Sequence, residues 1–527
     1  MKYINNPILK GFNPDPSILR VGDDYYIATS TFEWFPGVQI HHSKDLINWK
    51  LITHPLNRVS QLDMRGNPSS GGVWAPCLSY DNGTFYLIYT DVKSLHGIFK
   101  DTHNYLVTTK DILGQWSEPI YLNSSGFDPS LFHDDDGRKW FVNMIWEHRE
   151  EKNSFAGIVL QEYSSDEKQL VGTKMNIFLG SEIKRTEGPH LYKHNGYYYL
   201  MTAEGGTSWE HAITVARSRS ITGPYEICPD NPLITSVNNP TLELQKAGHG
   251  SLVETQNKEW YVVHLCGRPL PSRGRCTLGR ETAIQKVEWT NEGWLRLAQG
   301  GNEPFLQVPA PKLPEHPWKT EPEREDFDSE TLNINFQTLR VPLGEDSLSL
   351  KERSGFLRLK GQESLSSLFK QSLVARRQQS FCYTATTVLE YNPESSKQMA
   401  GLISLYDTEN FYYLRISNDE KLGKCLGIIA CDNGIYRQYI KDEVSIDGWD
   451  KCYLRVQVDY DKLQFFYSMD GENWITIGEV LDSSIMSDEY KDKLRFTGSF
   501  VGMCCQDLDG TKRYADFDFF EYVEKRL

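Results

Sequence analysis

Five segments in the first half of the chain share one sequence pattern, and this repeat restricts the fold more than any other feature. Each has a short apolar run, a turn rich in Asp, Asn and Gly, and an aromatic run, which is the pattern of a β-hairpin. The five apolar runs start with Asp15-Pro16-Ser17-Ile18, Ala75-Pro76-Cys77-Leu78, Asp128-Pro129-Ser130-Leu131, Glu187-Gly188-Pro189-His190-Leu191 and His249-Gly250-Ser251-Leu252. Aligned on the prolines (Gly250 in the fifth), they are 60, 53, 60 and 61 residues apart.

A second phrase recurs after several of these hairpins and predicts a turn before an outer strand. It stands at residues 43–49, 109–116 and 218–225. Repeated all-β units of about four strands form β-propellers, whereas the modules of a β-sandwich array run to roughly 100 residues each. The sequence therefore predicts an all-β chain whose first domain is a five-bladed β-propeller.

The composition changes after residue 300. Six prolines between 304 and 322 interrupt a charged stretch, which is typical of an extended linker. Alternating patterns then predict antiparallel strands at 401–406, 411–416, 453–458, 463–467 and 515–520. The predicted organisation is a propeller over residues 1–308, a Pro-rich linker over 309–325 and a lectin-like antiparallel β-sandwich over 326–527.

The charge balance limits the kind of partner. The formal net charge is −15 and the pI is about 5.4, which argues against a nucleic-acid or anionic-membrane partner and suits a neutral polar ligand. No run of 18 apolar residues is present, and the N-terminus has no apolar core of signal-peptide length.

The ten cysteines are scattered and form no CxxC pair, so the sequence supports neither a zinc site nor a disulfide framework. Free thiols in a reducing cytoplasm are the simpler interpretation, and we expect a cytoplasmic protein. A secreted precursor that has lost its signal peptide would look the same.

Three acids stand at the start of repeat strands. In a propeller the first strand of every blade lines the central channel, so Asp15, Asp128 and Glu187 converge at one end of that channel. Glu187 aligns one place earlier than the two Asp, so its carboxylate need not hold the equivalent position. Gly188, Pro189 and the apolar run behind them restrict and dehydrate Glu187, which raises a carboxyl pKa and favours a proton donor.

Such a cluster has several chemical interpretations. It could hold a divalent cation, bind a cationic ligand, or act as an acid/base pair. No EF-hand loop is present, and the acidic run 134–137 is more simply a hairpin turn. An isolated Glu would ordinarily be a surface residue; the recurrence of the motif favours a site.

Aromatic residues near the strand starts could stack on sugar rings, although a single Trp more often packs within a blade. They are Phe32, Trp34, Phe35, Trp74, Trp146 and Trp209, and Trp74, which directly precedes a repeat position, is the best candidate. His249 aligns with the two Asp, which favours a site role over a structural one. Arg280 either pairs with a site carboxylate or substrate hydroxyl, or forms a surface ion pair with Glu281.

These motifs resemble glycoside hydrolase family 43, and the chain is similar to the bacterial β-xylosidases that carry a C-terminal sandwich. The resemblance rests on Asn13-Pro14-Asp15-Pro16-Ser17, Gly72-Val73-Trp74-Ala75-Pro76, Phe127-Asp128-Pro129-Ser130, Thr186-Glu187-Gly188-Pro189-His190, Gly248-His249-Gly250-Ser251-Leu252 and Leu278-Gly279-Arg280-Glu281-Thr282. It implies an inverting mechanism in which Asp15 is the general base, Glu187 the general acid and Asp128 the group that orients the acid and adjusts its pKa. Related invertase-like propellers are retaining enzymes, but the Thr-Glu-Gly-Pro phrase is closer to the inverting group.

The same resemblance implies a set of pocket residues: Phe32, Trp74, Trp146, Thr207, His249, Arg280 and, from the sandwich, Phe500. It implies an exo-acting 1,4-β-xylosidase on xylo-oligosaccharides with α-L-arabinofuranosidase side activity. An arabinofuranosidase by main activity and a non-catalytic sugar-binding protein are the alternatives. We expect a homo-oligomer that needs no cofactor; a structural divalent cation in the channel stays open.

Overall fold

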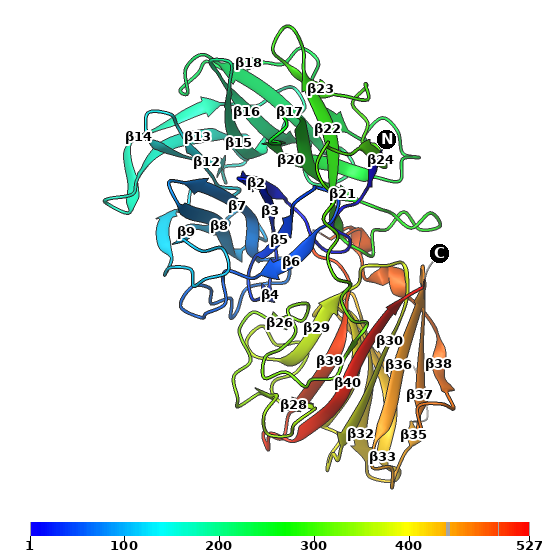
Figure 1. The fold of residues 1–527 in the computed structure, drawn as a ribbon. Helices are drawn as coiled ribbons and strands as arrows, with labels where there is room; N and C mark the ends of the chain where they lie inside the picture. The colour runs from blue at the N-terminus through cyan, green and yellow to red at the C-terminus, as the bar shows by residue number, and fades with distance from the viewer. Residues whose placement is uncertain (1, 439–442, 494, 526–527) are drawn as a thin grey trace.

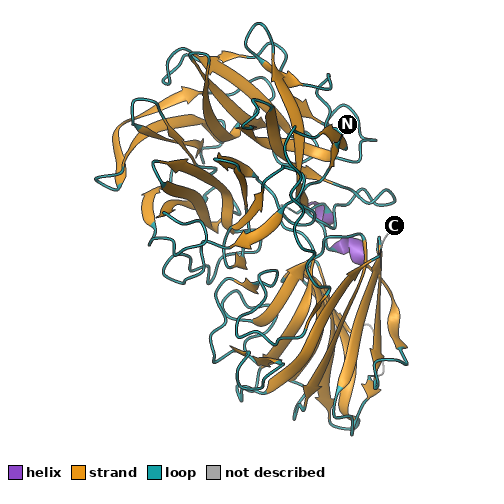
Figure 2. Cartoon of the chain, viewed as in Figure 1, coloured by secondary structure: helices purple, strands orange, loops and turns teal. Residues whose placement is uncertain are grey.

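The computed structural model describes residues 2–438, 443–493 and 495–525. Within them the chain is built from β-strands, apart from two short 3-10 helices, η1 (Ser483–Ile485) and η2 (Tyr490–Asp492) (Figure 2). The strands form two bodies, with the propeller in the upper part of Figure 1 and the sandwich in the lower part. No helix among the described residues is long and apolar enough to cross a membrane.

Five antiparallel sheets, four of them with four strands and one with five, confirm the predicted five-bladed propeller. The first blade consists of β2 (Ser17–Val21), β3 (Asp24–Thr29), β5 (Gln39–Ser43) and β6 (Lys50–Thr53). The second consists of β7 (Gly72–Asp81), β8 (Thr84–Ser94), β9 (Asp101–Thr109) and β10 (Ile120–Asn123). The third consists of β11 (Ser130–His133), β12 (Lys139–Trp146), β13 (Phe155–Ser164) and β14 (Gln169–Phe178). The fourth consists of β15 (Glu187–His194), β16 (Tyr197–Glu204), β17 (Ala212–Ser218) and β18 (Glu226–Ile227), with β19 (Ile234–Thr235) also on β17. The fifth consists of β20 (Gln245–Glu254), β21 (Trp260–Gly267), β22 (Arg280–Trp289) and β23 (Leu295–Leu297).

The first strand of each blade contacts the first strands of its neighbours, and β2 contacts β20, which closes the ring. Three blades have a Ser two residues after the first residue of the motif (Ser17, Ser130 and Ser251), and it forms hydrogen bonds to neighbouring blades. The N–H of Leu78 donates to Ser17 Oγ at 3.1 Å, and the N–H of Ile18 donates to Ser251 Oγ at 3.1 Å. Ser130 Oγ donates to the carbonyl of Pro189 at 2.6 Å. The recurring Ser is therefore a contact between blades.

The residue just before the aligned Pro (Gly250 in the fifth blade), here called the repeat position, has a left-handed backbone in every blade. The values of φ are 55° at Asp15, 37° at Ala75, 54° at Asp128, 56° at Gly188 and 49° at His249. L-residues other than Gly seldom adopt this region, and each such residue costs on the order of 1–3 kcal/mol. The shared conformation explains why the segments align on the residue that follows it.

The N-terminus and the end of the propeller form a small sheet of their own. β1 (Tyr3–Asn5) pairs with β24 (Gln307–Pro309), so Pro309 belongs to a strand rather than to the predicted linker. The stretch 310–323 contains no strand and lies along the propeller. Its N–H groups and side chains bond the blades: the N–H of His316 donates to Asp45 Oδ2 at 2.8 Å, and Trp318 Nε1 donates to the carbonyl of Asn48 at 3.2 Å.

The C-terminal half is an antiparallel sandwich of two sheets, as predicted. One sheet consists of β27 (Leu348–Ser349), β28 (Leu357–Lys360), β40 (Tyr514–Glu524), β30 (Cys382–Tyr391), β36 (Cys452–Asp459), β37 (Lys462–Ser468) and β38 (Ile475–Asp482), with β25 (Arg324–Glu325) also on β40. The other consists of β29 (Ser372–Arg377), β39 (Phe500–Asp507), β31 (Gln398–Asp407), β32 (Asn410–Asp419), β33 (Gly423–Asp432) and β34 (Ile435–Gln438), with β35 (Val444–Ser445) also on β33. Leu402, Val456, Phe465 and Phe517 belong to the fully buried core of the sandwich.

The two bodies share backbone pairing and a core. β4 (Trp34–Phe35) of the propeller pairs with β26 (Thr338–Leu339), which comes from the sandwich half. The rings of Trp34 and Phe500 are fully buried and stacked, with centroids 3.7 Å apart and planes 12° apart. One hydrophobic cluster therefore runs from the propeller into β39.

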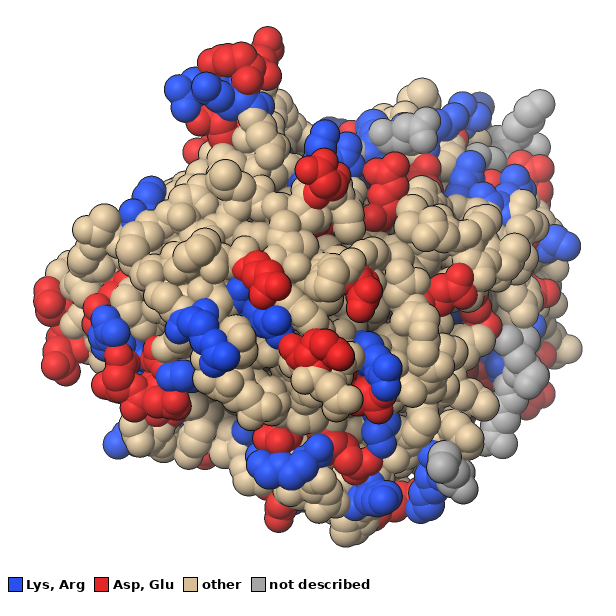
Figure 3. All heavy atoms as spheres, turned by 90° about the horizontal axis from the view of Figure 1, so that it is seen from above, with Lys and Arg blue, Asp and Glu red and all other residues tan. Residues whose placement is uncertain are grey.

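The surface carries charges of both signs. On the face shown in Figure 3, Lys and Arg are interspersed with Asp and Glu over uncharged residues. The excess of acidic residues in the composition does not gather into one patch on this face.

The Trp34–Phe500 pair gives a stability prediction. Phe500→Ala removes one of two stacked, fully buried rings, and burying a Phe in such a site contributes about 3–5 kcal/mol to the free energy of unfolding. We expect the midpoint of thermal unfolding, measured by scanning calorimetry, to fall by several degrees. Phe369→Ala is the control, because Phe369 is 57 % exposed. Equal melting of the two variants would show that the stacked pair does not stabilise the junction.

Candidate active site

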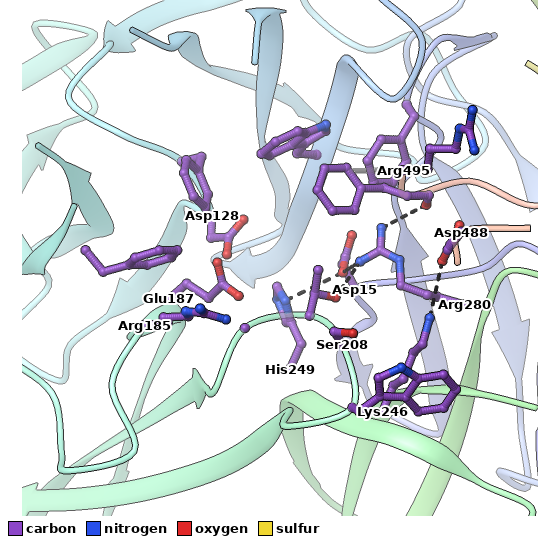
Figure 4. Close-up of a pocket in the computed structure, with 18 of the residues that line it drawn as sticks. Asp15, Asp128, Arg185, Glu187, Ser208, Lys246, His249, Arg280, Asp488 and Arg495 are labelled. Carbon is purple, nitrogen blue, oxygen red and sulfur yellow. Dashed lines mark hydrogen bonds and ion pairs between the residues drawn. The ribbon is translucent and has the colours of Figure 1, made fainter. Parts of the chain in front are cut away.

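A cavity of about 640 Å³ lies at the mouth of the propeller channel. It brings together the predicted residues Asp15, Phe32, Trp74, Asp128, Trp146, Glu187, Thr207, His249 and Arg280. Each blade contributes, because each inner strand starts at this mouth. Figure 4 shows the carboxyl groups of Asp128 and Glu187 directed toward one another, with Asp15 apart from them beside Arg280 and His249.

Asp15 is buried and surrounded by donors. Ser30 Oγ donates to Asp15 Oδ2 at 2.6 Å, and Arg280 Nη1 donates to Asp15 Oδ1 at 3.3 Å. His249 Nδ1 lies 3.6 Å from the same Oδ1. Burial raises the pKa of Asp15, but Arg280, His249 and the Ser30 hydroxyl together outweigh it, so the pKa lies below its ordinary value. Asp15 is an ionised carboxylate at neutral pH.

Glu187 has the opposite environment. It is buried, and burial raises the pKa of its carboxyl well above the ordinary value. The negative charges of Asp128 and Asp15 raise it further, against smaller opposing effects of Arg280 and Arg185. A carboxyl in this position holds its proton at pH values where Asp15 has lost its own.

The third acid, Asp128, also has a raised pKa. Burial raises the pKa of Asp128 to about 6, with His249 opposing the shift and Asp15 adding to it. The N–H of Gly188 donates to Asp128 Oδ2 at 3.0 Å, which fixes this carboxylate against the segment that carries Glu187. Gly188 adopts φ of 56° without the strain that an L-residue would carry there, and a Cβ at this position would meet the His249 ring at 3.2 Å, so a larger residue would require that ring to shift.

Arg280 forms hydrogen bonds with residues of both domains. Besides Asp15, its Nη1 donates to Thr207 Oγ1 at 2.9 Å, and its Nη2 donates to the carbonyl of Phe496 in the sandwich at 2.9 Å. The guanidinium lies 5.2 Å from the Phe32 ring centroid and 5.3 Å from that of Phe496. The surface ion pair with Glu281 is ruled out: Glu281 pairs with Arg268.

Aromatic rings form the walls. The Phe32 and Trp74 ring centroids are 6.0 Å apart, and Trp74 Nε1 donates to the carbonyl of Ser70 at 2.9 Å. Trp146 Nε1 donates to the carbonyl of Ile98 at 2.9 Å, and Lys100 Nζ lies 4.4 Å from its ring centroid. These contacts hold flat apolar faces beside the carboxylates, as sugar binding requires.

The prediction that Phe500 closes the cavity is wrong. Phe500 starts β39, and its ring is stacked on Trp34 inside the shared core, away from the cavity. Phe496, in the irregular segment before β39, lines the cavity instead. Its ring centroid lies 5.4 Å from Trp74 and 6.0 Å from Phe32. Because Phe500 belongs to β39, its side chain packs in the shared core. Phe496 lies before the strand, and its side chain faces the cavity.

Twelve of the residues that line the cavity were not predicted from the sequence. They are Lys100, Phe127, Phe155, Arg185, Gly206, Ser208, Lys246, Asp488, Glu489, Lys493, Arg495 and Phe496. Arg185 and Lys246 lie next to repeat segments and could have been suspected from that position. The group from 488 to 496 belongs to the sandwich, where no repeat marks it.

Lys246 shows how the sandwich group reaches the site. Its Nζ pairs with Glu489, lies 3.8 Å from Asp488 Oδ2 and lies 5.1 Å from the centroid of the Trp209 ring. A propeller lysine and two sandwich carboxylates thus form one wall, and the domain junction is part of the cavity.

The site has the groups for acid/base hydrolysis. The pKa of Asp15 is lowered, that of Glu187 is raised well above its ordinary value, and Asp128 adds to the shift of Glu187. Among the residues that the structure describes, no group of three or more His, Cys, Asp or Glu is placed to hold a metal ion.

Comparisons with known proteins agree with this geometry. Residues 4–295 match the family model "Glycosyl hydrolases family 43", and residues 324–523 match "Beta xylosidase C-terminal Concanavalin A-like domain". A solved xylan β-1,4-xylosidase from Bacillus halodurans C-125 is 60 % identical, with a TM-score of 0.98 over 99 % of this chain and 100 % of that one. The β-xylosidase of Bacillus subtilis (strain 168) is 55 % identical over 99 % of this chain and 100 % of its own length.

A third relative, "Xylosidase/arabinosidase 43B" of Humicola insolens, is 52 % identical over 99 % of this chain and 98 % of its own. Both domains are matched, and the similarity extends over almost the whole length of these proteins. The chain therefore belongs to glycoside hydrolase family 43 and is a glycoside hydrolase.

Proposed function

We propose that this protein is an inverting, exo-acting 1,4-β-xylosidase that releases xylose from the non-reducing end of xylo-oligosaccharides. The observation that carries the proposal is the opposed pKa shifts of two carboxyls in one aromatic-walled cavity. The pKa of Asp15 is lowered by Arg280, His249 and Ser30 against the effect of burial, and that of Glu187 is raised by burial and Asp128.

In the proposed mechanism Asp15 removes a proton from water, and this water attacks the anomeric carbon. Glu187 donates its proton to the leaving oxygen on the opposite face of the sugar. An inverting pair of this kind stands roughly 6.5–9.5 Å apart to admit the water. Asp128 keeps Glu187 protonated, because a second negative charge nearby disfavours its ionisation.

The aromatic walls of the cavity and the names of the relatives indicate which sugar the site binds. Rings such as Trp74 and Trp146 offer stacking faces for a pyranose. The relatives from Bacillus halodurans and Bacillus subtilis carry the names xylan β-1,4-xylosidase and β-xylosidase. Sandwich residues supply one wall of the cavity, and closure on that side favours a terminal sugar over the middle of a chain.

An α-L-arabinofuranosidase activity is the second candidate. The Humicola insolens relative is named a xylosidase/arabinosidase, and the two sugars present similar hydroxyl groups to a small pocket. We propose this as a side activity of the same site. A cytoplasmic location is also proposed; the ten cysteines are all free and buried, which suits a compartment that keeps thiols reduced.

The function is tested by the turnover of aryl β-xyloside and aryl α-arabinofuranoside, followed by proton NMR. We expect faster turnover of the xyloside, with α-xylose as the first product before mutarotation. Asp15→Asn should lower turnover by at least about 10²-fold, because an amide cannot accept the proton from water. Asp23→Asn, an exposed Asp in a hairpin turn of the same blade, is the control. First release of β-xylose, or an active Asp15→Asn, would overturn the proposed roles.

Glu187→Gln tests the general acid. A good leaving group departs without a proton, whereas a poor one needs it. We expect the variant to lose about 10²–10⁴-fold in kcat on xylobiose and much less on an aryl xyloside with an acidic phenol. An equal loss on both substrates would contradict the role of Glu187 as proton donor.

Ser30→Ala tests how the pKa of Asp15 is set. Loss of the 2.6 Å hydrogen bond to Oδ2 removes a group that stabilises the ionised carboxylate, so the pKa of Asp15 should rise. We expect the acid limb of kcat/KM to move up by about one pH unit, since a hydrogen bond to a charged group contributes about 1.5–3 kcal/mol. The alkaline limb should stay, because it belongs to Glu187 with Asp128. Ser94→Ala, at the end of β8, is the control, and an unmoved acid limb in Ser30→Ala would assign that limb to another group.

A further inference from the structure

A second cavity, of about 430 Å³, lies at the junction of the two domains. Its walls come from the segment before β2, from β5 and the β5–β6 region of blade 1, from the segment around Trp318 and from the end of β29 in the sandwich. It shares no lining residue with the active-site cavity. Nothing in the proposed hydrolysis uses it.

The charge of this cavity is opposite to that of the chain as a whole. Five cationic side chains line it, and they are Lys10, Lys50, Lys319, Arg376 and Arg377. Glu321 is the single carboxylate on its wall. Within the described part of the chain, the one ion pair of these cations is between Lys50 Nζ and Glu321 Oε1, at 3.6 Å. A chain with a net charge of −15 thus encloses a pocket with an excess of positive charge.

Arg377 is the most buried of the five, with 6 % of its surface exposed. Its Nε donates to the carbonyl of Phe12 at 2.6 Å and its Nη1 donates to Gln337, so both partners are neutral. The guanidinium also lies 5.2 Å from the Phe12 and Phe500 ring centroids. Burial lowers its pKa to about 9, and no carboxylate of the described residues pairs with it.

Three buried polar atoms on the cavity residues have no hydrogen-bond partner among the residues described. They are His41 Nδ1, Arg376 Nε and Arg377 Nη2. A buried donor without a partner costs about 1–3 kcal/mol, and more if it is charged. Two of these three atoms belong to the guanidinium groups of Arg376 and Arg377, which have no carboxylate partner among the described residues.

Water alone would satisfy the hydrogen bonds of the two guanidinium groups but would not compensate their charge. An oxyanion does both, because its oxygens accept several N–H donors and carry the opposite charge. We propose that this cavity is a binding site for a small oxyanion, either inorganic phosphate or a carboxylate such as a uronate. Since both domains supply its walls, a bound anion joins the propeller to the sandwich and stabilises the folded chain by mass action.

Thermal unfolding of the full-length protein in increasing phosphate tests the proposal, with sodium chloride added to keep the ionic strength constant. We expect the midpoint to rise and to saturate. In the double variant Lys319→Gln/Arg376→Gln the apparent Kd should be weaker by at least about tenfold, since charge-assisted bonds are lost. Lys312→Gln, an exposed lysine of the same segment outside the cavity, should behave as the wild type. The midpoint without phosphate and the glycosidase turnover report whether the variants fold.

Lys319→Gln alone serves if the double variant does not fold, because Lys319 is exposed. A second series uses glucuronate in place of phosphate. The anion with the lower apparent Kd identifies whether the site prefers phosphate or a carboxylate. Phosphate stabilises many proteins by exclusion from their surface, and that effect does not saturate and does not depend on one lysine. A linear rise shared by all variants would therefore overturn the proposal. Saturable binding that the variants leave unchanged would also overturn it, since it would place the anion elsewhere.

Discussion

The left-handed backbone at the start of each inner strand is the constraint on which the active site depends. It recurs at Asp15, Ala75, Asp128, Gly188 and His249, and non-Gly residues adopt it only when their surroundings enforce it. In blades one, three and five the left-handed residue itself lines the cavity. In blades two and four the residue before it, Trp74 or Glu187, does so. One backbone turn, repeated around a ring, therefore delivers acids, an imidazole and an indole to one cavity.

The distribution of positive charge then separates the roles of the acids. Burial acts on Asp15, Asp128 and Glu187 alike and raises all three pKa values. Arg280 and the Ser30 hydroxyl contact Asp15 directly, and only there do the opposing effects exceed burial. The contrast between base and acid thus comes from the positions of the Arg280 guanidinium, the His249 imidazole and the Ser30 hydroxyl.

Much of the propeller was predictable, because its repeat marks both the strands and the residues at their starts. The five blades, the antiparallel sandwich and the three acids of the cavity, with His249 and Arg280, could be predicted from sequence patterns such as Asp15-Pro16-Ser17 and Thr186-Glu187-Gly188. More than half of the residues that line the cavity could not. The sandwich wall was not predictable. Phe496 and Phe500 lie four residues apart in one short stretch, and which ring faces the cavity depends on where β39 begins. The pairing of β4 with β26 joins two-residue strands that are too short to give an alternating pattern.

The segment 12–15 makes the two domains one functional unit. Arg377 of the sandwich donates to the carbonyl of Phe12, and the N–H of Asn13 donates to the carbonyl of Arg280 at 2.9 Å. Asp15 follows two residues later and itself accepts a hydrogen bond from Arg280, whose Nη2 bonds the carbonyl of Phe496. Each guanidinium group thus donates a hydrogen bond across the domain junction to a main-chain carbonyl of the other domain. A shift of the sandwich relative to the propeller would change these contacts, so the position of Asp15 depends on how the two domains dock.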